Sequence, residues 1–285
     1  MYFMSTNINF DKKLGITGGA EIILPTNSTP SFQNLNSFLF DGIDEKMFST
    51  ANYTELNGTQ NFSISFWIKP KDTNAGIVWR LGSQSGNNRL ACLWRDNGSI
   101  DISFNTNSYY YRTAVGSVPL NQWTHIVYTF DGTQSRYNRP DVYINGVNAN
   151  SSATAGVIVT SSAFDGTLEL GGTGTSGTIN FGNNYIEELA VWNNTTLTET
   201  QSNELFNGGT PTDLNNIASG LTQPTTWFRM GDLAVWNGTI WTMTDVNGGT
   251  VVTSSNMQES SRTTDVPPNL FANTQSILLD GIDEY

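Results

Sequence analysis

The central part of the chain alternates strictly between apolar and more polar residues. One run covers residues 62–68 and ends at Pro70, with Phe, Ile, Phe and Ile at every second position. A second run covers residues 124–130, where Thr, Ile, Tyr and Phe take the alternate positions. Successive side chains of a strand point to opposite faces, so this period of two predicts strands with one face on a core.

Turn sequences separate the apolar runs at short intervals. Asp41-Gly42 and Asp131-Gly132 each follow such a run directly. Asn145-Gly146 stands between two short apolar segments and predicts a two-residue hairpin turn, because both residues tolerate a positive φ. Many short strands between turn residues indicate an all-β protein, a sandwich or a barrel. Further strands are expected at residues 20–24, 38–40, 90–94, 168–170 and 186–192.

One short helix is predicted among the strands. Thr198 and Gln201 have the spacing of a capping box, and Glu199 lies in the first turn, where a negative charge favours the helix dipole. Leu205 and Phe206 supply apolar contacts, and Gly208-Gly209 ends the segment.

Composition narrows the classes of function. Aromatic residues make up 12% of the chain, enough for a core, while charged residues make up only 13%. The net charge of −12 argues against binding nucleic acid, and no apolar segment is long enough to insert into a membrane. No secretory signal is visible at the start of the chain. The single cysteine, Cys92, excludes an intrachain disulfide, and one His with one Cys is too few for a zinc site.

An internal repeat links the two ends of the chain. The segment 32–45 recurs as 271–284 with nine identities in fourteen positions. The spacing is that of a domain, so a second copy of the first strand is predicted near the C-terminus. An unpaired strand exposes backbone groups, so this copy is expected to find a partner. The identical pairs are Phe32/Phe271, Asn34/Asn273, Ser37/Ser276, Leu39/Leu278, Asp41/Asp280, Gly42/Gly281, Ile43/Ile282, Asp44/Asp283 and Glu45/Glu284.

The order of these motifs resembles the laminin-G-like branch of the concanavalin A-like lectin/glucanase superfamily. The resemblance implies an antiparallel jelly-roll β-sandwich with one short helix, and it covers about residues 35–210. The motifs that carry it are Leu39–Asp44, Phe62–Pro70, Trp123–Val127, Val142–Gly146, Leu168–Gly172, Ile186–Asn193 and Leu197–Asn207.

The chain is also expected to contain four parts and to act on a virus particle. The expected parts are an N-terminal arm or linker (1–30), the sandwich (31–210), a connector with strands (211–268) and the first strand of a second repeat (269–285). Motifs of the connector resemble tandem laminin-G-like proteins of marine phages, which are usually virion structural or fibre-like proteins. This implies a homo-oligomer that contacts other virion proteins, on a virion surface or outside the cell, without a signal peptide.

No catalytic pattern emerges from the sequence, and no enzyme is expected. Hydrolases of this fold carry Glu-x-Asp-x-x-Glu on one strand, and the chain has no such pattern. Glu187 and Glu188 are adjacent, so a regular strand would send them to opposite faces. His125, the only histidine, lies on a predicted strand, and the resemblance implies that it packs there. Trp67 and Trp192 match core positions of the family.

Two kinds of binding site remain open. The candidates for carbohydrate binding are Trp94, Asn97, Tyr109, Tyr110 and Tyr111, since consecutive tyrosines must expose at least one ring. The alternative packs Tyr110 inside and places Tyr109 and Tyr111 at a subunit contact. The turns at Asp41 and Asp280 offer oxygen ligands for calcium, but turn capping explains them without a metal, so no cofactor is expected.

Two functional hypotheses follow. The first is a non-catalytic structural or adhesion component of a virion, such as a fibre, an appendage or a capsid-surface protein. The alternative is a carbohydrate-binding module that recognises a glycan on a host surface. The repeat favours the first.

Overall fold

The computed structural model describes residues 32–82, 89–104, 109–134, 140–149, 153–154, 164, 166–173 and 181–268. These residues belong to one compact unit that begins at Phe32. The predicted arm (1–30), with its weak strand, and the second copy of the repeat lie outside the described residues. No described helix is long and apolar enough to cross a membrane.

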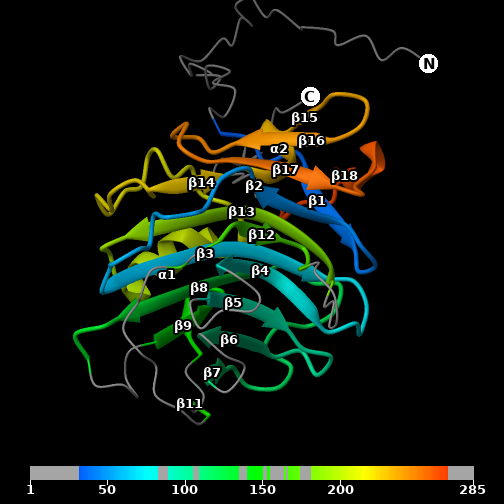
Figure 1. Ribbon diagram of the computed structural model, residues 1–285. Coiled ribbons are helices and arrows are strands. Elements are labelled where there is room, and N and C mark those ends of the chain that lie inside the picture. Colours follow the sequence, from blue (N-terminus) through cyan, green and yellow to red (C-terminus); the bar gives the residue numbers. More distant parts are fainter. Residues whose placement is uncertain are drawn as a thin grey trace, which may run out of the picture. The chain divides into compact units, whose positions relative to one another are not determined.

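The first sheet, sheet A, contains eight strands among the described residues, all antiparallel to their neighbours. Its order is β10-β9-β8-β3-β13-β1-β18, with β14 also beside β13 (Figure 1). The long strands β3 and β13 are neighbours at its centre. The bounds are β1 Ser37–Asp41, β3 Asn61–Pro70, β8 Thr124–Asp131, β9 Pro140–Ile144, β10 Val147–Asn148, β13 Asn183–Asn193, β14 Thr226–Phe228 and β18 Arg262–Thr263.

The second sheet, sheet B, contains ten strands within the described ranges. They follow the order β11-β7-β6-β5-β4-β12-β2-β17-β16-β15, again with antiparallel neighbours. The bounds are β2 Lys46–Ser49, β4 Gly76–Gly82, β5 Arg89–Trp94, β6 Ile100–Phe104, β7 Tyr109–Arg112, β11 Ala153–Thr154, β12 Leu168–Leu170, β15 Val235–Trp236, β16 Trp241–Thr244 and β17 Val251–Ser255.

The core lies between the two sheets. The alternate apolar residues of β3 point into it, as the sequence predicted, and they meet large side chains of sheet B such as Trp79. Full burial of one such side chain stabilises the fold by about 1.5–3 kcal/mol. The prediction of an antiparallel all-β sandwich is therefore confirmed.

The predicted helix is present as α1 (Glu199–Phe206). Thr198 is its N-cap and forms a capping box with Gln201. The helix covers the outer face of sheet A, where Leu205 joins a second apolar cluster and Phe206 lies beside Trp67, with 5.9 Å between ring centroids. Three shorter helical turns are η1 (Asn207–Gly209), α2 (Met230–Leu233) and η2 (Glu259–Ser261).

The predicted connector (211–268) is part of the sandwich rather than a separate segment. Its strands extend both sheets: β17 pairs with β2 in sheet B, and β14 and β18 pair with β13 and β1 in sheet A. The physical reason is that alternate residues of β16 and β17, such as Trp241, Met243 and Val252, are apolar and fill the same core. The expected end of the sandwich at residue 210 is thus corrected.

Candidate functional site

An open pocket of about 510 Å³ lies at the ends of several strands. This volume is within the range of pockets that bind small molecules. Four connections of the chain build the pocket: the β1–β2 turn, the β3–β4 loop, the β5–β6 turn and the segment that leads into β13. We call it the rim pocket. It is lined by Gly42, Ile43, Thr73, Asn74, Ala75, Asp96 and Phe181.

The β1–β2 turn is fixed by its own aspartate. One carboxylate oxygen of Asp41 accepts hydrogen bonds from the backbone N–H groups of Ile43 (2.8 Å), Asp44 (3.2 Å) and Glu45 (3.3 Å). Gly42 has a φ of +74°, and a Cβ there would approach the Cβ of Asn183 to 2.9 Å. The turn-capping explanation for Asp41 is therefore confirmed, while Asp280 lies outside the described residues.

The β3–β4 loop is fixed in the same way. Asp72 accepts hydrogen bonds from the backbone N–H of Asn74 (2.8 Å) and from the side-chain amide of Asn183 (2.7 Å). Asn74 and Asp96 are exposed, and so is the apolar side chain of Ile43 at 73%. The pocket thus presents one amide, one carboxylate and an apolar surface on loops that hydrogen bonds hold in place.

Two of the predicted carbohydrate contacts face the core instead. Trp94 is 1% exposed, and its indole N–H donates to the carbonyl of Val118 at 3.1 Å. Tyr111 is 5% exposed, and burial raises its pKa to about 12. Strand alternation places both rings on the inner face of sheet B, so neither offers a platform to a sugar, and the prediction is corrected for both.

The other predicted contacts lie elsewhere. Asn97 is exposed in the β5–β6 turn, where its side-chain oxygen accepts from the backbone and the hydroxyl of Ser99 at 3.1 and 2.7 Å. Its neighbour Asp96 lines the rim pocket. The backbones of Tyr109 and Tyr110 are in β7, but their side chains lie outside the described part of the chain. The predicted site residue Asn97 is therefore not in the pocket lining, but its neighbour Asp96 is.

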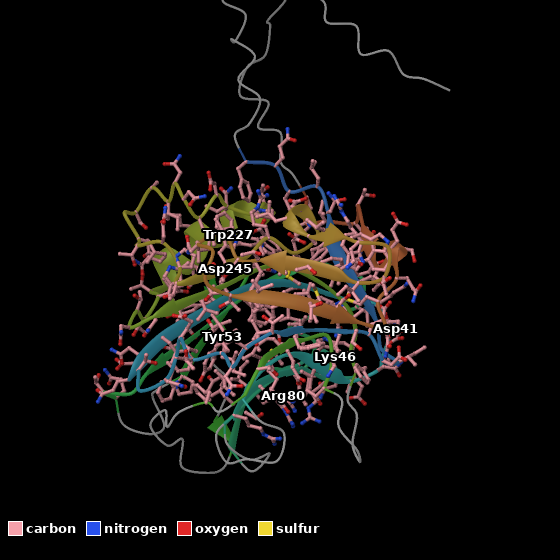
Figure 2. All side chains as sticks on the ribbon, turned by 45° about the horizontal axis from the view of Figure 1, so that its top comes forward. Asp41, Lys46, Tyr53, Arg80, Trp227 and Asp245 are labelled. Carbon is pink, nitrogen blue, oxygen red and sulfur yellow. The ribbon has the colours of Figure 1, made fainter. Side chains whose placement is uncertain are left out.

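A bulge in β13 overturns the expectation for Glu187 and Glu188. The pairing of β13 with β3 shifts register between Glu187 and Ala190, and Glu188 has a φ of +49°. Both carboxyl groups consequently approach Asp232 of α2, with ligand atoms of all three residues within 4.8 Å of one another. We call these three residues the acidic cluster. In Figure 2, Asp41, which caps the turn that carries Gly42 and Ile43 of the rim pocket, lies well away from Trp227, which borders the acidic cluster.

Glu187 and Glu188 of the acidic cluster are buried, Asp232 is half-buried, and Arg229 is the cation that pairs with the cluster among the described residues. Glu188 accepts hydrogen bonds from the indole N–H of Trp227 and from Nε of Arg229 (3.3 Å). Asp232 accepts from Nη2 of Arg229 at 3.0 Å and from the backbone N–H of Asn36 at 2.8 Å. No side chain of the described residues donates a hydrogen bond to the carboxyl group of Glu187.

Burial changes the protonation of the two glutamates. It raises the pKa of Glu188 to about 7, against the attraction of Arg229, and raises that of Glu187 well above its ordinary value. Glu187 is fully buried and Glu188 is 5% exposed, which leaves no room for a polysaccharide between them. Both carboxyl groups therefore bind a proton more tightly than an exposed glutamate does.

His125 packs inside, as the family resemblance implied. Its Nε2 lies 2.8 Å from Oγ of Ser65, and its ring lies beside Trp67, with centroids 4.9 Å apart. Nδ1 has no partner among the described residues, so no acid orients the ring as a catalytic triad requires. Burial lowers the pKa of His125 to about 3 and keeps it neutral.

Two antiparallel sheets with a helix on one outer face and a pocket at the strand ends define a lectin-like β-sandwich. The profile of the Concanavalin A-like lectin/glucanases superfamily matches residues 44–201, more than half of the chain. The chain belongs to this superfamily. No curated protein sequence matches it significantly.

Solved structures share the fold at low sequence identity. A candidate carbohydrate binding protein from Bacteroides ovatus is 15% identical with a TM-score of 0.58, and the match covers 83% of this chain and 62% of that one. The native heptameric SAP-like pentraxin from Limulus polyphemus is 18% identical with a TM-score of 0.50, covering 79% of this chain and 97% of that one. The chain thus spans less than two thirds of the first protein.

Proposed function

We propose that the chain is a carbohydrate-binding module and that the rim pocket is its ligand site. The observation that carries the proposal is the exposed pair of Asn74 and Asp96 beside the apolar side chain of Ile43. Sugar hydroxyls pair with amide and carboxylate groups, while the C–H faces of a sugar ring contact apolar surface. The hydrogen bonds of Asp41 and Asp72 hold the loops in place before a ligand arrives, which reduces the entropy lost on binding.

A glycan array with the full chain tests this proposal. We expect clear binding to one class of glycan, with a loss of at least about tenfold for Asn74→Ala and for Asp96→Ala, since each removes a hydrogen bond of about 1.5 kcal/mol to a polar ligand. Gln223→Ala, which changes an exposed amide away from the pocket, is the matched control and should bind as the parent does. Binding that survives both pocket variants would place the glycan elsewhere.

A second candidate function is structural, as a component of a virion fibre, appendage or capsid surface that adheres to a host. The repeat of residues 32–45 at 271–284 supports it. A second copy of a strand can pair with another copy of the sandwich and so link several sandwiches in an assembly. In this proposal the chain forms a homo-oligomer, contacts other virion proteins and acts outside the cell.

The mass of the full chain in solution tests the structural candidate. We expect light scattering to show an oligomer of defined size that persists on dilution into the nanomolar range. A monomer at high micromolar concentration would contradict self-assembly, and it would leave the glycan proposal untouched.

A further inference from the structure

Strand β1 occupies a slot inside sheet A rather than at its edge. It pairs with β13 on one side, with Leu39 opposite Tyr185, and with β18 on the other, with Phe38 opposite Arg262. Figure 1 shows β1 beside β18. Phe38 and Phe40 are fully buried in the core between the sheets. We call this position the slot: it lies between strands β13 and β18, and the apolar core of the sandwich lies beneath it.

Residues on both sides of β1 anchor the segment to the slot. The ring of Phe32 stacks on Trp227 at 6.1 Å, with the guanidinium of Arg229 4.2 Å from its centroid. At the other end, a carboxylate oxygen of Glu45 accepts from the hydroxyl of Ser261 at 2.7 Å. In the middle, the hydroxyl of Ser37 donates to the backbone carbonyl of Asp265 at 2.6 Å. Four further anchors are the buried Asn34, the turn cap Asp41, Gly42 with its positive φ and the carbonyl of Asp44.

The second copy of the segment retains every one of these anchoring residues. The positions at which the second copy differs from residues 32–45 are ones where the slot accepts another residue. Ile277 and Leu279 replace the two buried phenylalanines and remain apolar, and Thr274 replaces the exposed Leu35. Asp232 accepts hydrogen bonds from the backbone N–H groups of positions 35 and 36, which any residue supplies. It also accepts one from the side-chain amide of Asn36 at 3.1 Å, and Gln275 carries an amide at the matching position. The retained anchors are Phe271, Asn273, Ser276, Asp280, Gly281, Asp283 and Glu284.

We propose that the segment 271–284 is an alternative β1 that exchanges with residues 32–45 in the slot between β13 and β18. The inference rests on the repeat and on the contacts of the slot, and it is independent of glycan binding. Exchange between two copies links them through a shared strand, a recognised route to assembly that adds backbone hydrogen bonds without a new surface.

Exchange within one chain is also sterically possible. Asp265 contacts Ser37, and six residue steps separate it from Phe271, a reach of about 20 Å. Five steps separate Phe32 from Ser37, which span at most about 18 Å. The chain after β18 is therefore long enough to return along its own slot, and the experiments must distinguish the two routes.

Cysteine cross-linking reports which strand occupies the slot. In the full chain, Tyr185→Cys is combined with Leu278→Cys, and the control combines Tyr185→Cys with Leu39→Cys. Opposed residues of an antiparallel pair have Cβ atoms about 4.5–5.5 Å apart, within reach of a disulfide or a short thiol cross-linker. We expect both pairs to cross-link. A cross-linked monomer indicates exchange within the chain, and a dimer indicates exchange between chains. If the control cross-links and the variant with Leu278→Cys does not, the proposal is overturned.

A mutant cycle tests whether the copy can replace β1 in folding. Phe38→Asp places a charge in the core and disables β1, and Ile277→Asp disables the copy in the same way. We expect Ile277→Asp alone to leave the thermal midpoint unchanged and Phe38→Asp alone to lower it while cooperative unfolding persists. The double variant should lose cooperative unfolding. Equal behaviour of Phe38→Asp and the double variant, including failure of both to fold, contradicts the proposal.

Discussion

Replacing Glu187 by Gln is expected to raise the free energy of unfolding at pH 8 and to flatten its dependence on pH. The carboxyl group is fully buried beside a second buried carboxyl, and no side chain of the described residues donates a hydrogen bond to it, so its ionised form is costly. Glutamine has nearly the same shape and cannot ionise. The gain should increase as the pH rises, because the parent must hold a proton on a buried carboxyl that the unfolded chain has already released.

The sign follows from the direction of the pKa shifts. In the folded chain the pKa of Glu188 is raised to about 7 and that of Glu187 is raised well above its ordinary value, so the fold holds their protons more tightly than the unfolded chain does. Their stabilising effect is complete below about pH 4.5 and is lost as the pH rises through the folded pKa values. For Glu188 alone the loss between pH 4.5 and 7 is about 3 kcal/mol.

Urea unfolding at intervals from pH 5 to pH 8 measures this effect. His125 acts in the opposite sense, because its lowered pKa makes stability fall as the pH drops below about 6.5, so each variant is compared with the parent at the same pH. Glu259→Gln, at an exposed site, is the matched control and should follow the parent. A Glu187→Gln chain with the parent's pH dependence would show that Glu187 is not the proton-holding group.

Replacing Arg229 by Met is expected to destabilise the fold by about 3–5 kcal/mol at neutral pH. Arg229 pairs with Glu188 and Asp232, and the described residues offer these two carboxylates no other ion pair. Its guanidinium also lies over the rings of Phe32 and Trp227. Removing it leaves buried negative charge without compensation, which costs more than the pair contributes.

A second substitution separates charge from packing. Adding Glu188→Gln to Arg229→Met removes the stranded charge and should restore part of the stability, as urea unfolding would show. Arg262→Met is the control, since the exposed side chain of this arginine makes only a ring contact among the described residues, 5.8 Å from the centroid of Trp241, and its loss should cost about 1 kcal/mol or less. If the double variant were no more stable than Arg229→Met, the loss would come from packing alone.

Local patterns were sufficient to predict the central strands β3 and β8 and the helix α1, because period and capping depend on neighbouring residues. The bulge at Glu187 and Glu188 was not predictable in this way. It is stabilised by Trp227 and Arg229, about 40 positions along the chain, which bond to the carboxylate of a residue with positive φ. In a regular strand, the side chains of Glu187 and Glu188 would point to opposite faces of the sheet, as the sequence predicted.

The candidate site was predictable only in part for a related reason. The rim pocket joins four connections that are distant in the sequence, and the predicted carbohydrate contacts reached only the one that contains Asp96 and Asn97. Trp94 and Tyr111 were misplaced because aromatic residues fit either face of a strand, and only the packed sheets decide between them. The β3–β4 loop of the pocket could have been predicted from the spacing of Asp72 and Asn74, because Asp-x-Asn is typical of a turn that is capped by a side chain.

The contribution of residues 211–263 to both sheets bears on how the protein can be divided. A fragment ending at residue 210 would lack β14, β16, β17 and β18, and it would uncover one edge of β2 and one edge of β1. Exposed edges with apolar faces recruit strands from other molecules, so such a fragment would precipitate or form irregular aggregates. A fragment that retains these strands runs from Phe32 to at least Asp265, whose carboxylate accepts hydrogen bonds from Lys69 and Trp123 at the end of sheet A.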